Sequence, residues 1–109
     1  MFVVGKIKIE NVVASTDIQK VISPDKLLNI LEASEYEPEQ FPGLVYRLDE
    51  PRVATLIFRS GKIICVGARS ISAAKIALRK TVHNIKKIGI RVNENKIRVK
   101  IENIVVAIN

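Results

Sequence analysis

Residues 52–66 read RVATLIFRSGKIICV, two runs rich in β-branched and aromatic side chains on either side of a Ser-Gly pair. Serine followed by glycine favours a tight turn, so this segment predicts an antiparallel hairpin. Because successive side chains of a strand point to opposite faces, Ala54, Leu56 and Phe58 fall on one face of the hairpin, and Val53 and Ile57 fall on the other. Both faces of the hairpin are therefore apolar.

Patterns on both sides of this hairpin predict more of the fold. The run GLVYRLD at 43–49 is typical of a third strand of a meander, and Glu50 and Pro51 separate it from the hairpin. After the hairpin, apolar residues recur at spacings of three and four, which predicts a long helix. Ser70 is expected to cap the start of this helix and Gly89 to stop it.

A shorter helix is predicted upstream, where Ser23 can cap a first turn that contains Pro24. Its expected buried stripe is Leu27, Leu28, Ile30 and Leu31. The acidic run at 35–39 is expected to end it. The strands predicted from the residues alone are 6–15, 43–49, 52–59, 62–66 and 96–108.

The first and last of these strands share the tetrapeptide Lys-Ile-Glu-Asn, at residues 8–11 and again 92 positions later at 100–103. Conservative exchanges on both flanks extend the match. Internal repetition of this kind indicates duplicated structural units. We therefore expect residues 1–95 to form one complete repeat, and residues 96–109 to be the first strand of a second, truncated repeat.

Two helices can cover only one face of the predicted sheet, which leaves the other apolar face without a partner. The uncovered patch is expected to contain Leu56, Phe58, Ile64 and Val66. An apolar patch of this kind marks an interaction surface. A second sheet, a second copy of the chain, or a ligand are the occupants that the residues leave open.

The charge favours a polyanion as the ligand. Eighteen Lys and Arg against eleven Asp and Glu give a net charge of +7 and an isoelectric point near 9.8. Between Lys75 and Lys100 there are nine basic residues and one acidic residue. This basic run is either a solvated helix face or a binding surface.

The sequence also argues against several classes of protein. The single cysteine, Cys65, cannot form an internal disulfide or a multi-cysteine zinc site. Neither a membrane span nor a signal peptide is apparent, so a cytoplasmic protein is expected. There is no phosphate-binding loop, no H-E-x-x-H motif and no nucleophile with a plausible base, so we expect no enzyme, no cofactor and no metal.

Two long motifs carry a resemblance to a known family. EYEPEQFPGLVYRLDEP at 35–51 and LIFRSGKIICVGARS at 56–70 are similar to the TATA-binding protein family, most of all to its archaeal members, and the similarity extends over residues 6–109. It implies an α+β fold with a β-α-β4-α repeat, in which two helices lie on the convex face of a curved antiparallel sheet. This repeat is half of a saddle.

The resemblance also implies a function, which the residues alone do not. It predicts a general transcription initiation factor that binds the minor groove of A·T-rich promoter DNA, the TATA box, and kinks it by inserting phenylalanines. Matched in this chain, the wedges are Phe41 and Phe58, and the base-edge contacts are Asn11 and Asn103. The apolar contacts are Val13, Leu56, Ile64, Val66 and Val105, and the contacts near the phosphates are Arg47, Ser60, Lys62 and Arg69.

The implied partners are double-stranded promoter DNA and, in a full-length protein, transcription factor B. A second copy of the chain, paired through the open edges of the Lys-Ile-Glu-Asn strands, is a further expected partner. Two other functions remain open at this point. One is a homodimerising interaction module, and the other is a non-specific nucleic-acid-binding domain of an enzyme that processes RNA or DNA.

Overall fold

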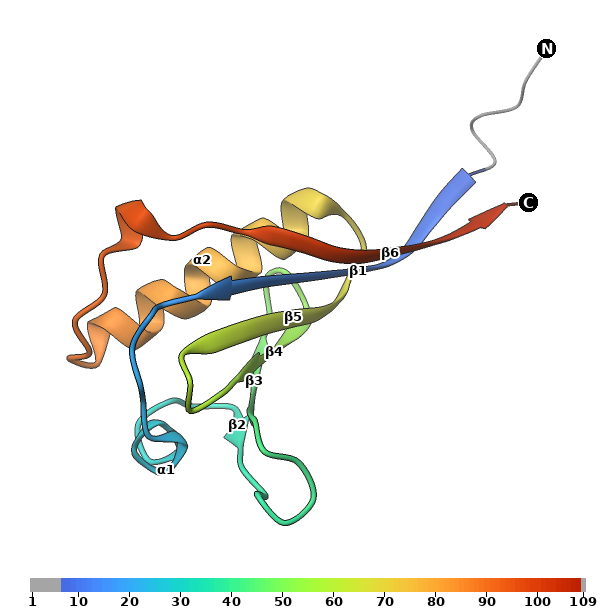
Figure 1. Cartoon of the computed structure of the whole chain (residues 1–109). Coiled ribbons are helices and arrows are strands. Elements are labelled where there is room, and N and C mark those ends of the chain that lie inside the picture. Colours follow the sequence, from blue (N-terminus) through green and yellow to red (C-terminus); the bar gives the residue numbers. More distant parts are fainter. Residues whose placement is uncertain (1–6, 109) are drawn as a thin grey trace.

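The computed structural model describes residues 7–108, which form a single antiparallel sheet together with two α-helices (Figure 1). The strands are β1 (Ile7–Asp17), β2 (Ser34–Glu35), β3 (Leu44–Leu48), β4 (Val53–Ile57), β5 (Lys62–Ala68) and β6 (Lys100–Ile108), and the helices are α1 (Pro24–Leu28), α2 (Ile71–Lys87) and the short 3-10 helix η2 (Glu94–Lys96). Neighbouring strands follow the order β2-β3-β4-β5-β1-β6. The α+β class and the β-α-β4-α order are thereby confirmed.

Strands β3, β4 and β5 form the predicted meander. Val45 of β3 lies opposite Leu56 of β4, which in turn lies opposite Ile64 of β5. Along β4 the side chains alternate, so that Thr55 and Ile57 are buried while Leu56 between them stays partly exposed. The two-faced pattern that the hairpin sequence predicts is therefore present.

Strands β1 and β6 run antiparallel across the sheet and extend beyond the other strands as a two-stranded ribbon (Figure 1). Their pairing has an internal two-fold symmetry: Asn11 lies opposite Val105, and Val13 lies opposite Asn103. The ladder is interrupted beside Glu10 on one strand and beside Glu102, its counterpart 92 positions later, on the other. The repeated tetrapeptides thus occupy equivalent places on both sides of one local axis.

Both helices cover the same face of this sheet. Leu27 of α1 and Leu78 of α2 are fully buried and belong to one cluster with the core-facing residues of the strands, such as Ile57. Burying a large aliphatic side chain of this kind contributes about 1.5–3 kcal/mol. The core therefore lies between the sheet and the two helices.

A buried polar network adds to this packing between β4 and α2. The hydroxyl groups of Thr55 and Thr81 lie 3.1 Å apart, and Thr81 also donates to the carbonyl oxygen of Ala77 at 2.9 Å. Thr55 is 3.2 Å from the carbonyl oxygen of Tyr46 on β3. Since both hydroxyl groups have partners, their burial carries no unpaired polar atom.

The long helix has the ends that the sequence predicts. Ser70 is the N-cap, and its hydroxyl oxygen accepts from the backbone N–H of Ala73 at 2.9 Å. Gly89 follows the last turn with a positive φ of 106°. Ile71, the first residue of the helix, is 37% exposed. Neither helix of residues 7–108 is long and apolar enough to cross a membrane.

Two local expectations were wrong, and one element was not predicted. Ile30 is exposed because α1 ends at Leu28, before the turn that would have buried it. The last strand begins at Lys100 and not at residue 96, because the side chain of Asn93 accepts from the N–H of Asn95 and starts a 3-10 turn. The two-residue strand β2 was not predicted from the residues.

Candidate nucleic-acid interface

The face of the sheet opposite the helices carries a row of partly exposed side chains, here called the open face. Its members on the four central strands are Asn11, Val13, Val45, Ala54, Leu56, Ile64 and Val66. All six strands of residues 7–108 belong to one sheet, so no second sheet covers this face within that part of the chain. A second sheet, one of the three occupants considered from the sequence, is therefore not formed by residues 7–108. A second copy of the chain and a ligand remain.

Two phenylalanines stand at one end of the open face. The ring centroids of Phe41 and Phe58 are 5.7 Å apart, and the ring planes meet at 63° in an edge-to-face arrangement. Phe41 is 39% exposed and Phe58 is partly exposed. Gly43 makes room for the pair, because a Cβ atom there would lie 2.7 Å from Phe41 and 3.0 Å from Phe58. Neither ring is part of the core.

The segments that hold these two rings are short turns. The backbone N–H of Phe41 donates to the carbonyl oxygen of Glu37 at 3.0 Å, which closes the loop between β2 and β3. Phe58 follows β4, and its N–H donates to the carbonyl oxygen of Lys62 at 2.9 Å. The backbone of both phenylalanines is therefore held by hydrogen bonds within short turns.

Asn11 lies on β1 in the middle of the sheet, with its side chain partly exposed. Its Oδ1 atom accepts from the backbone N–H of Gly67 at 2.9 Å. That bond directs Oδ1 toward Gly67, and among the described side chains the Nδ2 group has no hydrogen-bond partner. An amide held in this way presents a hydrogen-bond donor to whatever lies on the open face.

Strand β6 continues the open face past β1. On this strand Asn103 is exposed and Val105 is 45% exposed. The local two-fold axis relates Asn103 to Asn11 and Val105 to Val13. This brings all four predicted residues of the two Lys-Ile-Glu-Asn strands together. It also corrects one expectation: the edge of β1 at this tetrapeptide is paired with β6 of the same chain. Only the outer edge of β6 remains open at this side of the described sheet.

The predicted phosphate-contacting residues lie at three places in the sheet. Ser60 and Lys62 belong to the turn between β4 and β5, where the Ser60 hydroxyl oxygen accepts from the N–H of Lys62 at 3.3 Å. Arg69 is exposed directly after β5. Arg47 of β3 is already paired, since its guanidinium lies 3.0 Å from the Glu35 carboxylate and both side chains are more than half exposed. Arg47 would have to exchange this pair for another anion.

The sequence that forms this sheet matches one known family. Residues 6–88 match the family described as "Transcription factor TFIID (or TATA-binding protein, TBP)". The chain belongs to this family.

Relatives show how much of a family member the chain represents. The TATA-box-binding protein of Methanocaldococcus jannaschii is 54% identical over 100 residues, which are 92% of this chain and 54% of that protein. That of Archaeoglobus fulgidus is 50% identical over the same shares of the two chains. The solved structure of Methanococcus jannaschii TBP superposes with a TM-score of 0.81 at 52% identity, over 93% of this chain and 57% of that one. The chain therefore spans about half the length of these relatives, and its fold is that of half a TBP saddle.

The sequence missed one member of the open face. Val45 lies opposite Leu56, so it stands within the row that this TBP-type sheet presents. Alternation along β3 was the available signal, because Val45 is two residues from Arg47 and shares its face. Ala54, which alternation placed on the same face as Leu56 and Phe58, lies opposite Val66 in this row.

The TBP family is one of transcription factors and not of enzymes, in agreement with the expectation from the sequence. The only thiol, that of Cys65, is buried in β5, and burial raises its pKa to about 11. A thiol of that pKa is protonated near neutral pH and is a poor nucleophile. Among the residues that the structure describes, no cluster of His, Cys, Asp and Glu could hold a metal ion.

Proposed function

We propose that this chain is a TBP-type transcription initiation factor whose open face binds the minor groove of A·T-rich promoter DNA, the TATA box. One observation carries the proposal: an apolar sheet face that no described element covers ends at two accessible phenylalanines. The minor groove offers few hydrogen-bonding groups and distinguishes mainly A·T from G·C pairs, so a largely apolar surface suits it.

In the proposed complex, Phe58 and Phe41 enter between base pairs and unstack them. Unstacking costs a few kcal/mol for each step, and this cost is offset by the protein surface that a bent duplex brings into contact. Pyrimidine-purine steps such as TA unstack most easily, which adds a preference that needs no direct base contact. To enter the duplex, the rings of Phe41 and Phe58 would either separate from each other or enter the same base-pair step together.

The remaining residues of the interface have distinct roles in the proposal. Asn11 and Asn103 donate to adenine N3 or thymine O2, the acceptors on the groove floor. The apolar residues Val13, Leu56, Ile64, Val66 and Val105 pack on bases and sugars. Arg47, Ser60, Lys62 and Arg69 lie near phosphates and fix position without reading sequence.

The two-fold register of β1 and β6 supports the proposed division of the chain. Residues 1–95 are one TBP repeat, and residues 96–109 are the first strand of a second repeat. Transcription factor B is the protein partner that we propose for a full-length protein with both repeats. A second copy of the chain would have to pair at the outer edge of β6. The proposed site of action is the cytoplasm, on the nucleoid.

The proposal is tested by titrating the 109-residue chain with A·T-rich and G·C-rich duplexes of equal length at several salt concentrations, with sedimentation of the same samples. We expect tighter binding to the A·T-rich duplex at every salt concentration. Equal affinities with a steep salt dependence would instead indicate general polyanion binding. A dimer that ignores both duplexes would indicate a homodimerising module, for which the exposed Ile104 and Val106 of β6 provide a surface.

Replacing Lys62 with glutamine is expected to lower the slope of log affinity against log salt by about one unit, because one phosphate contact is lost. The affinity should fall equally for all duplex sequences, since a phosphate contact reads none of them. Lys26→Gln on α1 removes the same charge from the other side of the protein and should leave the slope unchanged. Equal slopes for the Lys62 variant and the unmodified chain would remove this residue from the interface.

Asn11→Asp is expected to weaken binding to the A·T-rich duplex by roughly tenfold or more, because it replaces a groove-facing donor with a negative charge. The carboxylate can still accept from the N–H of Gly67, so the thermal unfolding temperature should change little. Asn29→Asp, at the exposed end of α1, adds the same charge away from the open face. If both variants bind equally well, Asn11 does not face the DNA.

A further inference from the structure

A hollow of about 490 Å³ lies at the end of the sheet where α1, the β4–β5 turn and the segment after α2 meet (Figure 1). Residues of 20–26 and of 89–91 line it together with Arg59, the residue that follows Phe58. We call it the basic hollow. Small-molecule sites in proteins commonly occupy about 300–1,000 Å³, so the basic hollow has room for a small organic ligand.

Four positively charged side chains line the basic hollow, those of Lys20, Lys26, Arg59 and Arg91. All four residues are exposed, and none of them forms an ion pair with a carboxylate in residues 7–108. No Asp or Glu is among the lining residues. Like charges gathered around one hollow repel each other and attract anions, so a bound polyanion would stabilise this arrangement.

The segments that form the basic hollow are joined by hydrogen bonds. The ammonium group of Lys20 donates to the carbonyl oxygen of Arg91 at 2.7 Å. The backbone N–H of Ile22 donates to the carbonyl oxygen of Arg59 at 3.0 Å. The loop before α1 is thus connected to both segments that carry the arginines. Because this backbone is already ordered, a ligand would have to order only side chains, which lowers the cost of binding.

Apolar side chains form part of the wall between the charges. Ile22 is almost fully buried and Ile90 is partly buried, whereas Val21 is 74% exposed. Gly89 adds no side chain, and a Cβ atom there would meet nothing within 4 Å, so the hollow is open on this side. An exposed valine beside a cluster of cations offers contact area to an apolar part of a ligand whose charged part lies among the cations.

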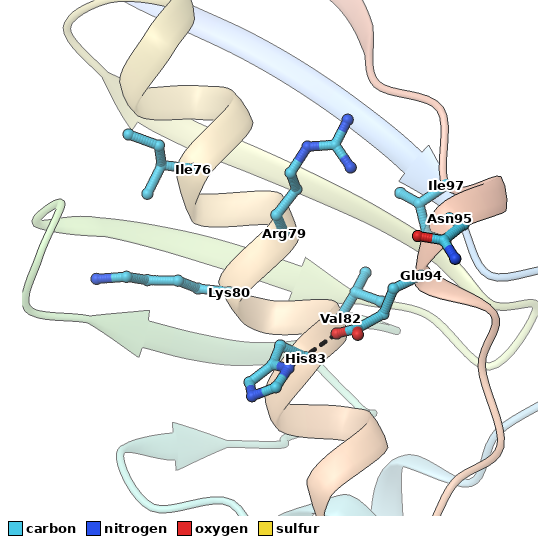
Figure 2. A pocket seen from close by; sticks show the side chains of 8 residues that line it. All are labelled: Ile76, Arg79, Lys80, Val82, His83, Glu94, Asn95 and Ile97. Atoms are coloured by element: carbon cyan, nitrogen blue, oxygen red, sulfur yellow. Dashed lines mark hydrogen bonds and ion pairs between the residues drawn. The ribbon is translucent and has the colours of Figure 1, made fainter.

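A hollow of similar size between α2 and residues 94–97 differs in its charge. It contains a carboxylate, that of Glu94, which lies 2.9 Å from Nδ1 of His83 (Figure 2). Hydrogen bonding with His83 holds the pKa of Glu94 below its usual value, so this carboxylate is ionised near neutral pH. It would repel a ligand with several negative charges. The basic hollow has no such group among its lining residues.

We propose that the basic hollow binds a nucleoside polyphosphate. The phosphate chain would lie among Arg59, Arg91 and the two lysines, and the sugar or the base would lie on Val21 and Ile90. Arginine and lysine are well suited to phosphate oxygens, and the apolar wall favours a nucleoside polyphosphate over a bare polyphosphate. No lining residue carries a carboxylate or an imidazole that could act as a general base, so the ligand would be bound and not hydrolysed.

A DNA duplex fits the basic hollow less well. Its phosphates are spread along a stiff helix, whereas the four cations surround one hollow. Lys26 belongs to α1, which covers the face of the sheet opposite the open face. A nucleotide in the basic hollow would therefore leave the open face accessible, and the inference does not rest on the proposed DNA binding.

The test is a fluorescence titration of the 109-residue chain with ATP that carries a methylanthraniloyl group on its ribose. We expect saturable binding of one probe per chain. Arg59→Gln and Arg91→Gln should each weaken it about tenfold, because each removes a charged contact with a phosphate. Arg79→Gln on α2 removes the same charge outside the basic hollow and should bind like the unmodified chain. Thermal unfolding of each variant shows whether it is folded.

Competition with unlabelled compounds tests the identity of the ligand. ATP should displace the probe at a several-fold lower concentration than inorganic triphosphate, because only the nucleoside contacts the apolar wall. Val21→Ser should remove most of this difference and leave the affinity for inorganic triphosphate unchanged. Equal displacement by both compounds from the unmodified chain would contradict the proposed nucleoside contact.

Other outcomes would also overturn the inference. An equal loss of affinity in Arg79→Gln would indicate general charge attraction. Displacement by a poly-glutamate peptide as effective as that by ATP would assign the hollow to acidic peptides. Displacement by a G·C-rich duplex, with weaker duplex binding in Arg91→Gln, would assign it to nucleic acid. Normal binding of the A·T-rich duplex together with no binding of the probe would leave the proposed function standing and this inference wrong.

Discussion

Replacing Phe58 with alanine is expected to remove most of the bend that the chain imposes on an A·T-rich duplex, while weakening binding by only roughly tenfold, or ~1.4 kcal/mol. The two effects separate because the ring acts mainly by unstacking base pairs, whereas the rest of the open face supplies contact area. Phe41→Ala should act in the same direction, since the two rings touch at 5.7 Å between centroids.

Energy transfer between dyes at the two ends of a labelled duplex measures the bend, and anisotropy of the same duplex measures the affinity. Ile30→Ala is the matched control, because it truncates an exposed apolar side chain that lies outside the open face. This control should leave both the bend and the affinity unchanged. Unfolding in urea should show that each variant remains folded, since neither ring is in the core.

An unchanged bend in both phenylalanine variants would remove the wedge role, even if the affinity fell. A large loss of affinity with a normal bend would instead make the rings part of the contact area. In either case, the duplex would be bent without insertion of these two rings, so another part of the open face would have to produce the bend. The double variant is informative as well, because the effects of two touching residues are not expected to add.

The sequence predicted best those elements whose signals are local. The N-cap at Ser70, the three-to-four spacing of apolar residues and the stop at Gly89 together define α2, and the structure confirms its two ends. The open face was also predictable, because alternation in β4 and β5 requires two apolar faces while a pair of helices covers one. In these cases the signals come from residues that are close together in the sequence.

Elements that depend on distant partners were not predictable from the residues alone. Strand β2 is two residues long, and only its pairing with Val45 and Tyr46 makes it a strand. The pairing of Asn11 with Gly67 joins residues 56 positions apart and gives no signal in either segment. The hollow between α2 and residues 94–97 arises likewise, because these residues reach α2 through a 3-10 turn, where the sequence predicted the start of a strand.

Gly61→Ala is expected to destabilise the fold by about 2–4 kcal/mol, more than a change of one methyl group normally does on a surface turn. Gly61 has a φ of +99°, where side chains other than hydrogen are strained. A Cβ atom there would also lie 2.5 Å from the carbonyl oxygen of Lys20 and 3.2 Å from the side chain of Ile18. The turn and the segment after β1 would have to separate.

That separation would break a backbone contact of the fold, because the N–H of Ile18 donates to the carbonyl oxygen of Gly61 at 3.0 Å. Gly89→Ala is the matched control: its φ is +106°, but a Cβ atom there meets nothing within 4 Å. Gly89→Ala should lower the free energy of unfolding by only about 1 kcal/mol, the cost of placing a side chain at a positive φ. Urea unfolding measures both variants, and equal losses would show that the approach of Lys20 does not constrain this turn. A larger loss for Gly61 would attribute the excess to the close approach of Lys20 and Ile18 to this turn, whose backbone also bonds Phe58, since the N–H of Gly61 donates to the carbonyl oxygen of Phe58 at 2.9 Å. The stability of the sheet would then be linked to the position of the proposed wedge.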